Sequence, residues 1–349
     1  MGDPLTNMFP VLAQRLPKTQ LANLPTPVSQ HEVSAAGRSH SVAVKHDDVT
    51  AELYGGNKVR KLEFLLRRAS DKNAKRIATF GTVASNHALA TALYARSLGF
   101  ECTCFLSHQT KTPNCARALN THLINGTEIV RLGGKRTEII ATLRRYLHGR
   151  EAWVLPPGGS SWLGVIGFVN AGLELADQVN AGELPEPDRL YVANGTMATA
   201  SGLALGLALA GLRTDVQAIR VTHEFMANRL AMQSLIRKTG TLMHMLDASV
   251  PGDLASRVNL SFRDEFFGGG YARSNESTDR AVELAKAEFG ITLETTYTGK
   301  AMAALLHDLD RSAGKVLFWN TYNSRPLPAG TELPDDTGGL PREFLRYYD

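Results

Sequence analysis

A lysine that follows two glycines and an asparagine is the first group in this sequence whose setting suits chemistry. It lies in the stretch Gly55–Glu63. The glycines let the backbone turn tightly and approach a ligand, and Lys58 would then sit in the first turn of a helix. There the positive end of the helix dipole and the cations Arg60 and Lys61 would lower its pKa, and a neutral amine is the form that attacks an aldehyde. The stretch also fits an ordinary solvated helix start, and alone it does not decide between the two.

A second candidate stretch, Gly81–His87, lies between an expected strand and an expected helix. Its backbone amides and hydroxyl groups would open toward a helix N-terminus, which is a natural place for a carboxylate. Ser85 could equally be a plain helix N-cap. Both interpretations remain open from the sequence.

A third stretch, Asn194–Gly202, is rich in small and hydroxyl-bearing residues. Backbone N–H groups and side-chain hydroxyls in such a turn can hold a phosphate. The Lys-Ser/Thr ending of a nucleoside triphosphate loop is missing, and the Gly-x-Gly-x-x-Gly spacing of dinucleotide sites does not match. A turn made only for packing is also compatible. Together, the three stretches offer an imine-forming lysine, a carboxylate turn and a phosphate turn, which an amino-acid enzyme using pyridoxal phosphate needs.

The elements that would position these groups alternate between apolar runs and helical patterns. This alternation predicts parallel strands joined by crossover helices. The expected strands cover residues 76–80, 100–106, 190–193, 216–221 and 315–319, and the expected helices 85–97, 198–212, 226–237 and 276–289. Proline-rich points at residues 24–27, 156–157 and 185–187 are expected joints between lobes.

Composition excludes several classes of function. The 349 residues suit two α/β domains, and the net charge of +4 looks thinly spread, without the basic run that nucleic acid would require. The apolar stretch 198–212 is too short to span a membrane, and residues 1–15 lack a signal-peptide pattern. Three cysteines, an odd number, indicate a reducing compartment, so we expect a cytoplasmic protein. Cys102 and Cys104 have no further ligands nearby, so no metal site is expected.

The stretch Gly55–Glu63 resembles the D-cysteine desulfhydrase and 1-aminocyclopropane-1-carboxylate deaminase family, of the tryptophan-synthase-β type of pyridoxal-phosphate enzymes. The resemblance extends from about Leu24 to about Phe318. It implies a fold type II α/β protein with two open twisted sheets in two lobes. Residues 1–55 and 157–349 would form the larger, cofactor-binding domain, and residues 56–156 a smaller inserted domain. It also implies pyridoxal 5'-phosphate as cofactor and a homodimer.

The resemblance carries residue roles onto this chain. The Schiff-base lysine falls on Lys58, and Ser85 and Tyr297 would assist proton transfer. Asn86 would bond the phenolic oxygen of the cofactor, and Thr298 would bond its ring nitrogen. The phosphate turn falls on Gly195, Thr196, Met197, Ala198 and Thr199, although Met197 and Ala198 make it less glycine-rich than usual. Implied substrate contacts are Ser85, Asn86, His87, Gly159, Ser160, Tyr271 and Tyr322.

Thr298 helps to choose between reactions in this family. In the ring-opening deaminases a carboxylate follows the tyrosine and can keep the ring nitrogen protonated, whereas a neutral hydroxyl cannot do so strongly. We therefore expect β-elimination on a small amino acid such as D-cysteine or L-cysteate, giving pyruvate and ammonia. Ring opening of 1-aminocyclopropane-1-carboxylate, a β-replacement synthase and a non-catalytic ligand-binding relative are the alternatives.

Two segments depart from the family pattern. Residues 320–325 replace the usual His-Thr-Gly-Gly turn, and residues 270–273 replace the usual Gly-Tyr-Gly. Both would lie where substrate side chains are met, so the substrate could differ from D-cysteine and from the cyclopropane acid. Arg325 or Arg273 could meet an anionic group such as the sulfonate of L-cysteate. Each could equally be a surface arginine.

Overall fold

A six-stranded sheet forms the centre of the larger lobe. The computed structural model describes residues 2–35, 37–311, 314–327 and 339–348. The sheet has the order β1-β2-β10-β7-β8-β9, with an antiparallel β1–β2 hairpin and parallel pairing among the remaining neighbours. Its strands are β1 (Val28–Ala35), β2 (Arg38–Lys45), β7 (Arg189–Asn194), β8 (Asp215–Arg220), β9 (Leu260–Arg263) and β10 (Val316–Trp319).

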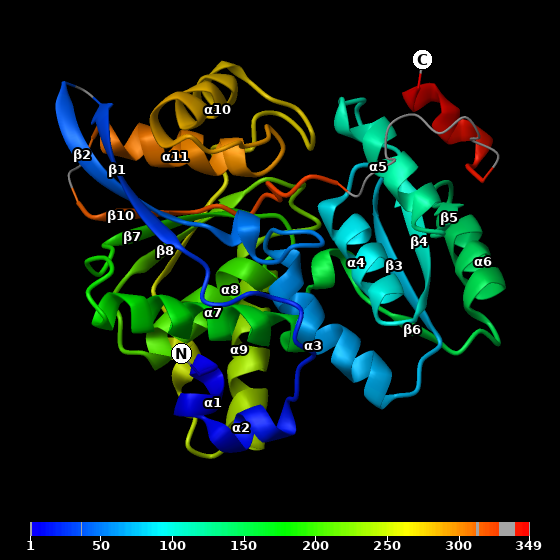
Figure 1. Ribbon diagram of the computed structural model, residues 1–349, viewed down its shortest axis with the longest axis horizontal. Helices are drawn as coiled ribbons and strands as arrows, with labels where there is room; N and C mark the ends of the chain where they lie inside the picture. The colour runs from blue at the N-terminus through cyan, green and yellow to red at the C-terminus, as the bar shows by residue number, and fades with distance from the viewer. Residues whose placement is uncertain (1, 36, 312–313, 328–338, 349) are drawn as a thin grey trace.

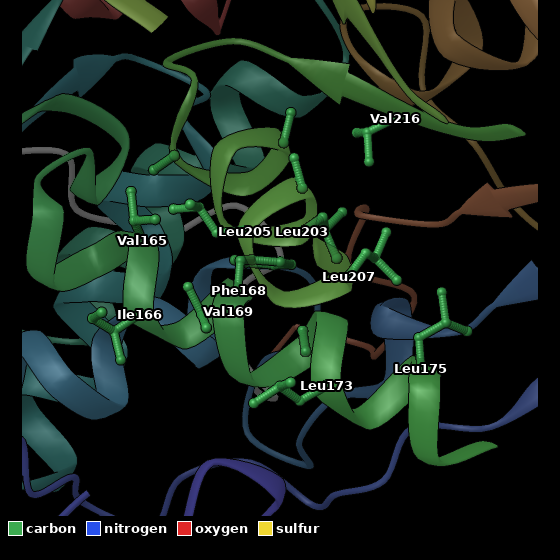
Figure 2. Packing of buried hydrophobic residues seen from close by; sticks show 14 of the residues in the cluster. Val165, Ile166, Phe168, Val169, Leu173, Leu175, Leu203, Leu205, Leu207 and Val216 are labelled. Carbon is green, nitrogen blue, oxygen red and sulfur yellow. The ribbon is translucent and has the colours of Figure 1, made fainter. Parts of the chain in front are cut away.

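Helices cover both faces of this sheet (Figure 1). On one face α7 and α8 pack against each other, and Figure 2 shows side chains such as Phe168 and Leu203 meeting between them. The central strands β7, β8 and β10 are mainly buried, as expected of parallel strands covered on both faces, whereas residues 28–34 of β1, at the edge, are exposed or half-buried except for Val33. The helices of this lobe are α1 (Pro4–Met8), α2 (Pro10–Arg15), α7 (Trp162–Asn180), α8 (Ala198–Leu209), α9 (Arg229–Leu246), α10 (Glu276–Phe289) and α11 (Thr298–Leu309), with short 3-10 turns η1 (Asp47–Val49), η2 (Pro157–Gly159) and η3 (Leu254–Ser256).

The smaller lobe contains a four-stranded, wholly parallel sheet with the order β5-β4-β3-β6. Its strands are β3 (Arg76–Thr82), β4 (Glu101–Ser107), β5 (Glu128–Arg131) and β6 (Ala152–Val154), and its helices α4 (Asn86–Ser97), α5 (Asn114–Ile124) and α6 (Arg136–Leu147). Helix α3 (Lys58–Asp71) leads from one lobe to the other (Figure 1). The two-sheet α/β architecture predicted from the sequence is confirmed.

Several element boundaries differ from the sequence prediction. Helix α8 ends at Leu209, three residues early, and α9 runs over 229–246 where 226–237 was expected. Asn228 delays the start of α9 because its side chain accepts a hydrogen bond from the N–H of Ala231 and so caps the helix there. The β1–β2 hairpin and the strands β5, β6 and β9 had no counterpart in the prediction.

The end of the chain returns to the smaller lobe. The 3-10 turn η4 (Arg342–Tyr347) buries Phe344 and Tyr347 among the apolar residues of that lobe. The expected assignment of all residues from 157 to 349 to the larger domain stays a prediction, but this last segment packs against the other lobe.

The positive charge is also unevenly distributed. Residues 56–156 contain far more lysine and arginine than aspartate and glutamate, so the charge is concentrated in the smaller lobe and is not thinly spread as expected. Many of these cations, including Arg136 and Arg145 of α6, are exposed. Such a lobe attracts anions. None of the described helices is long and apolar enough to cross a membrane.

Candidate active site

A cavity of about 520 Å³ lies between the two lobes. Thr82, Ser107 and Asn194, which line it, are the last residues of β3, β4 and β7. The cavity therefore opens at the carboxyl ends of strands from both sheets, where ligands bind in open α/β folds.

Lys58 reaches this cavity from the first position of α3. The turn before it depends on glycine, because Gly56 has a φ of +85° and a side chain on Gly55 would meet the backbone oxygen of Asp48 at 2.0 Å. Burial lowers the pKa of Lys58 to about 8, while the charge of Glu294 opposes that shift. Desolvation, and not the neighbouring cations named in the sequence analysis, is the leading cause of the lowered pKa.

Arg60 was expected to lower the pKa of Lys58 by its charge, but in the structure it belongs to a buried ion-pair network. Its guanidinium is buried and bonds Asp47 (Nη2 to Oδ1, 2.8 Å) and Glu174 (Nη1 to Oε2, 2.9 Å). Lys45 also donates to Glu174, at 2.6 Å. Burial alone would raise the pKa of Glu174, but the charges of Arg60 and Lys45 lower it to about 2. The charge of Arg60 is thus compensated, and the network fixes the first turn of α3 to the larger lobe.

Lys61 is a buried cation for which the described residues show no carboxylate ion pair. Lys61 lines the cavity, and its Nζ donates to the carbonyl oxygen of Gly158 at 3.3 Å. Burial lowers its pKa well below the usual value, and the charge of Lys58 adds to that. A buried ammonium on a cavity wall is stabilised by an anion bound there.

The small-residue turn before α8 faces the same cavity. Gly195, Thr196, Met197 and Thr199 line it, whereas Ala198 is buried as the first residue of the helix. The hydroxyl of Thr199 accepts from Asn57 at 3.0 Å, and that of Thr196 accepts from Ser160 at 2.7 Å. Gly158 lies against this turn, because a side chain there would meet Thr196 Oγ1 at 2.1 Å. Lys61 and the helix N-terminus therefore converge on one region that suits an anion.

Ser85, Asn86 and His87 also line the cavity. The hydroxyl of Ser85 accepts from the N–H of Ala88 at 3.3 Å, so Ser85 is both the N-cap of α4 and a cavity residue. The side-chain oxygen of Asn86 accepts from the hydroxyl of Tyr54 at 3.0 Å. Burial, followed by the charges of the two lysines, lowers the pKa of His87 well below its usual value, so this imidazole is neutral.

The comparison with known proteins agrees with this geometry. A family model described as "Pyridoxal-phosphate dependent enzyme" matches residues 19–321. The chain belongs to this family. It is 31% identical over 333 residues to a D-cysteine desulfhydrase of Salmonella schwarzengrund, covering 90% of this chain and 96% of the relative, and equally similar to one of Salmonella newport.

Solved structures place this pyridoxal-phosphate-dependent enzyme among fold type II proteins. A structure titled as an ACC deaminase homologue aligns with a TM-score of 0.74 and 27% identity, covering 92% of this chain and 95% of that one. An L-serine ammonia-lyase from Rhizomucor miehei shares the fold, with a TM-score of 0.60, 19% identity and coverage of 87% and 95%. The enzyme uses pyridoxal phosphate and is a lyase or deaminase, as predicted.

The residues present fit pyridoxal phosphate. The phosphate would rest on the N-terminus of α8 beside Lys61, whose buried amine lacks a carboxylate partner among the described residues. The Lys58 amine, with its lowered pKa, would meet the aldehyde group. In the sequence Lys61 is only a cation close to Lys58, and no local signal distinguishes it from Arg60.

Thr298 and Glu294 lie next to each other at the start of α11. Thr298 is not among the residues that line the cavity, and its hydroxyl lies 3.2 Å from Oε1 of Glu294. Glu294, which the sequence analysis missed, does line the cavity and accepts from the backbone N–H groups of Thr296, Tyr297 and Thr298. Burial raises its pKa, which those hydrogen bonds oppose. The contact of Thr298 with the ring nitrogen stays a prediction.

The expected substrate residues are partly gathered at the cavity. Tyr271 and Tyr322 line it, as does Tyr297, which was expected to assist proton transfer. Gly159 and Ser160 follow the lining residues Pro157 and Gly158 without lining it. Arg273 and Arg325 do not line it, and Arg325 instead bonds Glu52 at 2.9 Å. In the described ranges no three His, Cys, Asp or Glu residues lie close enough to hold a metal ion.

Proposed function

We propose that this enzyme eliminates the β-substituent of a small amino acid such as D-cysteine, giving pyruvate and ammonia. The observation that carries the proposal is the cavity between the lobes. Its wall includes Lys58, which supplies the amine, and the turn at Ser85, which suits a carboxylate. It also includes the turn before α8, which suits a phosphate, at Gly195, Thr196, Met197 and Thr199. The relatives named as D-cysteine desulfhydrases, similar over 90% of this chain, support the same reaction.

The cofactor phosphate, the cofactor phenolic oxygen and the substrate carboxylate would each have a matching region of the protein. The phosphate would be held by Lys61, Gly195, Thr196 and Thr199, and the phenolic oxygen by Asn86. The N-terminus of α4 at Ser85 would receive the substrate carboxylate. Bound in this way, the cofactor supplies an electron sink for the charge that develops when the α-proton leaves.

Lys58 is the group we assign to removal of the α-proton. A pKa of about 8 leaves part of its amine neutral near physiological pH, and a base with a pKa near the working pH is the effective one. Tyr297, which lines the same cavity, carries a second proton on its hydroxyl group. The hydroxyl of Tyr271 lies 2.6 Å from the hydroxyl of Tyr297. We assign Ser85 and Tyr297 to proton transfer at the reacting carbons.

A ring-opening deaminase is the second candidate, because Glu294 places a carboxylate on the cavity wall. A carboxylate at the ring nitrogen would favour that chemistry. The oxygens of Glu294 are, however, engaged with three backbone N–H groups of the α11 start. Elimination therefore remains the function the geometry supports best.

L-cysteate is less well supported than an uncharged substrate. Neither Arg273 nor Arg325 lines the cavity. Burial raises the pKa of the cavity residue Tyr322, and Arg117 lies near enough for its charge to oppose that rise. Arg117 is nevertheless exposed on α5 and does not line the cavity. A sulfonate would lack the bidentate partner that arginine offers.

A screen of the holoenzyme tests the proposal. D-cysteine, L-cysteine, L-cysteate and 1-aminocyclopropane-1-carboxylate are each incubated with enzyme, and pyruvate, α-ketobutyrate and ammonia are measured. Pyruvate from a cysteine enantiomer is the expected result; α-ketobutyrate from the cyclopropane acid would establish the second candidate. Absence of both products from all four compounds, with bound cofactor visible, would indicate a non-catalytic relative.

The Lys58→Ala variant tests whether Lys58 is the amine that forms the imine with the cofactor. We expect it to lose the imine absorption band and the turnover together. Light scattering tests the homodimer, which the family resemblance supports. Fractionation of source cells tests the cytoplasmic location, which the cysteine usage supports.

A further inference from the structure

Part of the cavity wall is apolar and comes from both lobes. Phe80 of β3 and Leu132, which follows β5, line it from the smaller lobe, and Phe225 and Met226, which follow β8, line it from the larger one. We call these four residues the apolar wall. The ring of Phe80 is stacked on Phe105 with centroids 5.4 Å apart, so it is held in place.

Phe225 is the unusual member of the apolar wall. It lines the cavity yet is 80% exposed, although a phenylalanine usually loses much more of its surface to packing. His223 stacks against its ring with centroids 5.8 Å apart, and His223 in turn packs edge-on against Phe267. The ring is therefore supported from one side and open on the other. An apolar group bound against it would be removed from water together with the ring.

Among the described residues, the cavity offers no free cation for an anionic group beside the apolar wall. No arginine lies among the cavity-lining residues in the described ranges, and the lining lysines, Lys58 and Lys61, are assigned to the cofactor. His108 also lines the cavity, but burial, assisted by the charges of Arg346 and Arg131, lowers its pKa. A negatively charged substituent would thus lose its hydration here without gaining a cationic partner.

We propose that the preferred substrates carry an apolar group on the β-sulfur, as in S-alkyl and S-aryl thioethers of cysteine. The proposal rests on the β-elimination proposed above and names its substrate class. The α-C–H and Cβ–S bonds break, the electron pair of the Cβ–S bond leaves with sulfur, and sulfur takes a proton to become a thiol. With one water the remainder becomes pyruvate and ammonium, so no oxidant or reductant is required.

Binding of two amino acids without a leaving group tests the proposal independently of chemistry. Homophenylalanine replaces the sulfur of S-phenylcysteine by CH2, and 2-aminobutanoate replaces the thiol of cysteine by CH3. Dissociation constants of both enantiomers of each are measured by calorimetry on the holoenzyme. We expect homophenylalanine to bind roughly tenfold tighter or more. We expect Phe225→Ala to remove most of that advantage.

Leu230→Ala is the matched control, because Leu230 is 77% exposed, lies five residues away and does not line the cavity. It should leave the ratio of the two dissociation constants unchanged. Equal binding of the two compounds, or an unchanged ratio in Phe225→Ala, would overturn the proposal.

Turnover separates this inference from the proposed function. If S-phenylcysteine exceeds cysteine in kcat/KM and Phe225→Ala reverses that order, the inference holds. If cysteine releases pyruvate but cysteine or L-cysteate is preferred over the thioether, this inference alone fails. If no cysteine derivative releases pyruvate, the proposed function itself fails.

Discussion

The hydroxyl groups of Tyr271 and Tyr297 lie 2.6 Å apart, and the hydroxyl of Tyr271 is also 3.3 Å from that of Thr82 in the other lobe. Burial is the main cause that raises the pKa of both phenols, so both keep their protons at neutral pH. The pair connects the phosphate-turn side of the cavity with the smaller lobe. In the proposed reaction Tyr297 would be the proton donor, and Tyr271 would orient it.

Removal of the Tyr297 hydroxyl should therefore slow the reaction more than removal of its partner. For Tyr297→Phe we expect kcat to fall by about 10²-fold or more, since a positioned acid or base contributes at least that much. For Tyr271→Phe we expect a smaller loss, on the order of tenfold, because it acts through Tyr297. Steady-state kinetics measure both. Tyr146→Phe on α6, outside the cavity, should match the unmodified enzyme; a loss there would show a general effect of tyrosine removal.

Capture of the cofactor by the apoenzyme should depend on pH through Lys58. Below a pKa of about 8 the amine is protonated and cannot attack an aldehyde, so the rate should rise with pH and level off above that value. Stopped-flow absorbance after mixing apoenzyme with pyridoxal phosphate measures it. A midpoint near 10.5, the ordinary lysine value, would contradict the desolvation of Lys58.

The buried network around Arg60 should contribute strongly to stability. Arg60→Met would leave the carboxylates of Asp47 and Glu174 without their guanidinium, and breaking a buried pair in this way costs about 3–5 kcal/mol in the free energy of unfolding. Urea denaturation measures the change. Arg67→Met removes an arginine of the same helix that pairs at the surface with Asp71, and it should cost less than about 1 kcal/mol. Equal losses for the two variants would show that burial is not the cause.

Met197 should be a strained position. It has a φ of +72° at the N-cap of α8, a left-handed conformation that costs a residue with a side chain roughly 1–2 kcal/mol. Met197→Gly should therefore leave thermal stability unchanged or raise it, whereas the β-branched Met197→Val should lower it. Calorimetric melting of the apoenzyme measures both. A lower melting temperature for the glycine variant than for the valine variant would contradict the strain.

Tyr347 should support the cavity from the C-terminal segment. Its hydroxyl accepts from the N–H of Gln109 at 3.0 Å, and the side-chain oxygen of Gln109 accepts from the N–H of Ala84, next to Ser85. Tyr347→Phe keeps the buried ring, so the protein should stay folded with a loss of about 1 kcal/mol in the free energy of unfolding, while KM rises.

The matched control for this prediction is the neighbouring tyrosine. The Tyr348 hydroxyl donates to Asn120 on α5, away from Ala84. Tyr348→Phe should therefore leave KM unchanged. A rise in KM for both variants would mean that the segment acts only through overall stability.

The amino-acid sequence by itself determined the features that depend on local spacing. The glycines before Lys58, the hydroxyl-rich turn at Gly195 and the alternation of apolar runs with helical patterns are read directly from neighbouring residues. They were sufficient to predict parallel strands with crossover helices and a site suited to pyridoxal phosphate, whereas the family and the two-sheet arrangement followed from the resemblance carried by Gly55–Glu63. Backbone freedom and hydrophobic periodicity depend on only a few neighbouring residues, so they can be recognised before the fold is known.

Only the tertiary structure decided which charges and hydroxyls face the cavity. Arg60 and Lys61 are adjacent in sequence, but Arg60 meets Glu174 from 114 residues away while Lys61 stays without a carboxylate partner in the described ranges. The Thr298 hydroxyl bonds Glu294, and Arg325 pairs with Glu52. These outcomes depend on contacts between distant segments and on the desolvation they impose, and neither leaves a trace in local spacing.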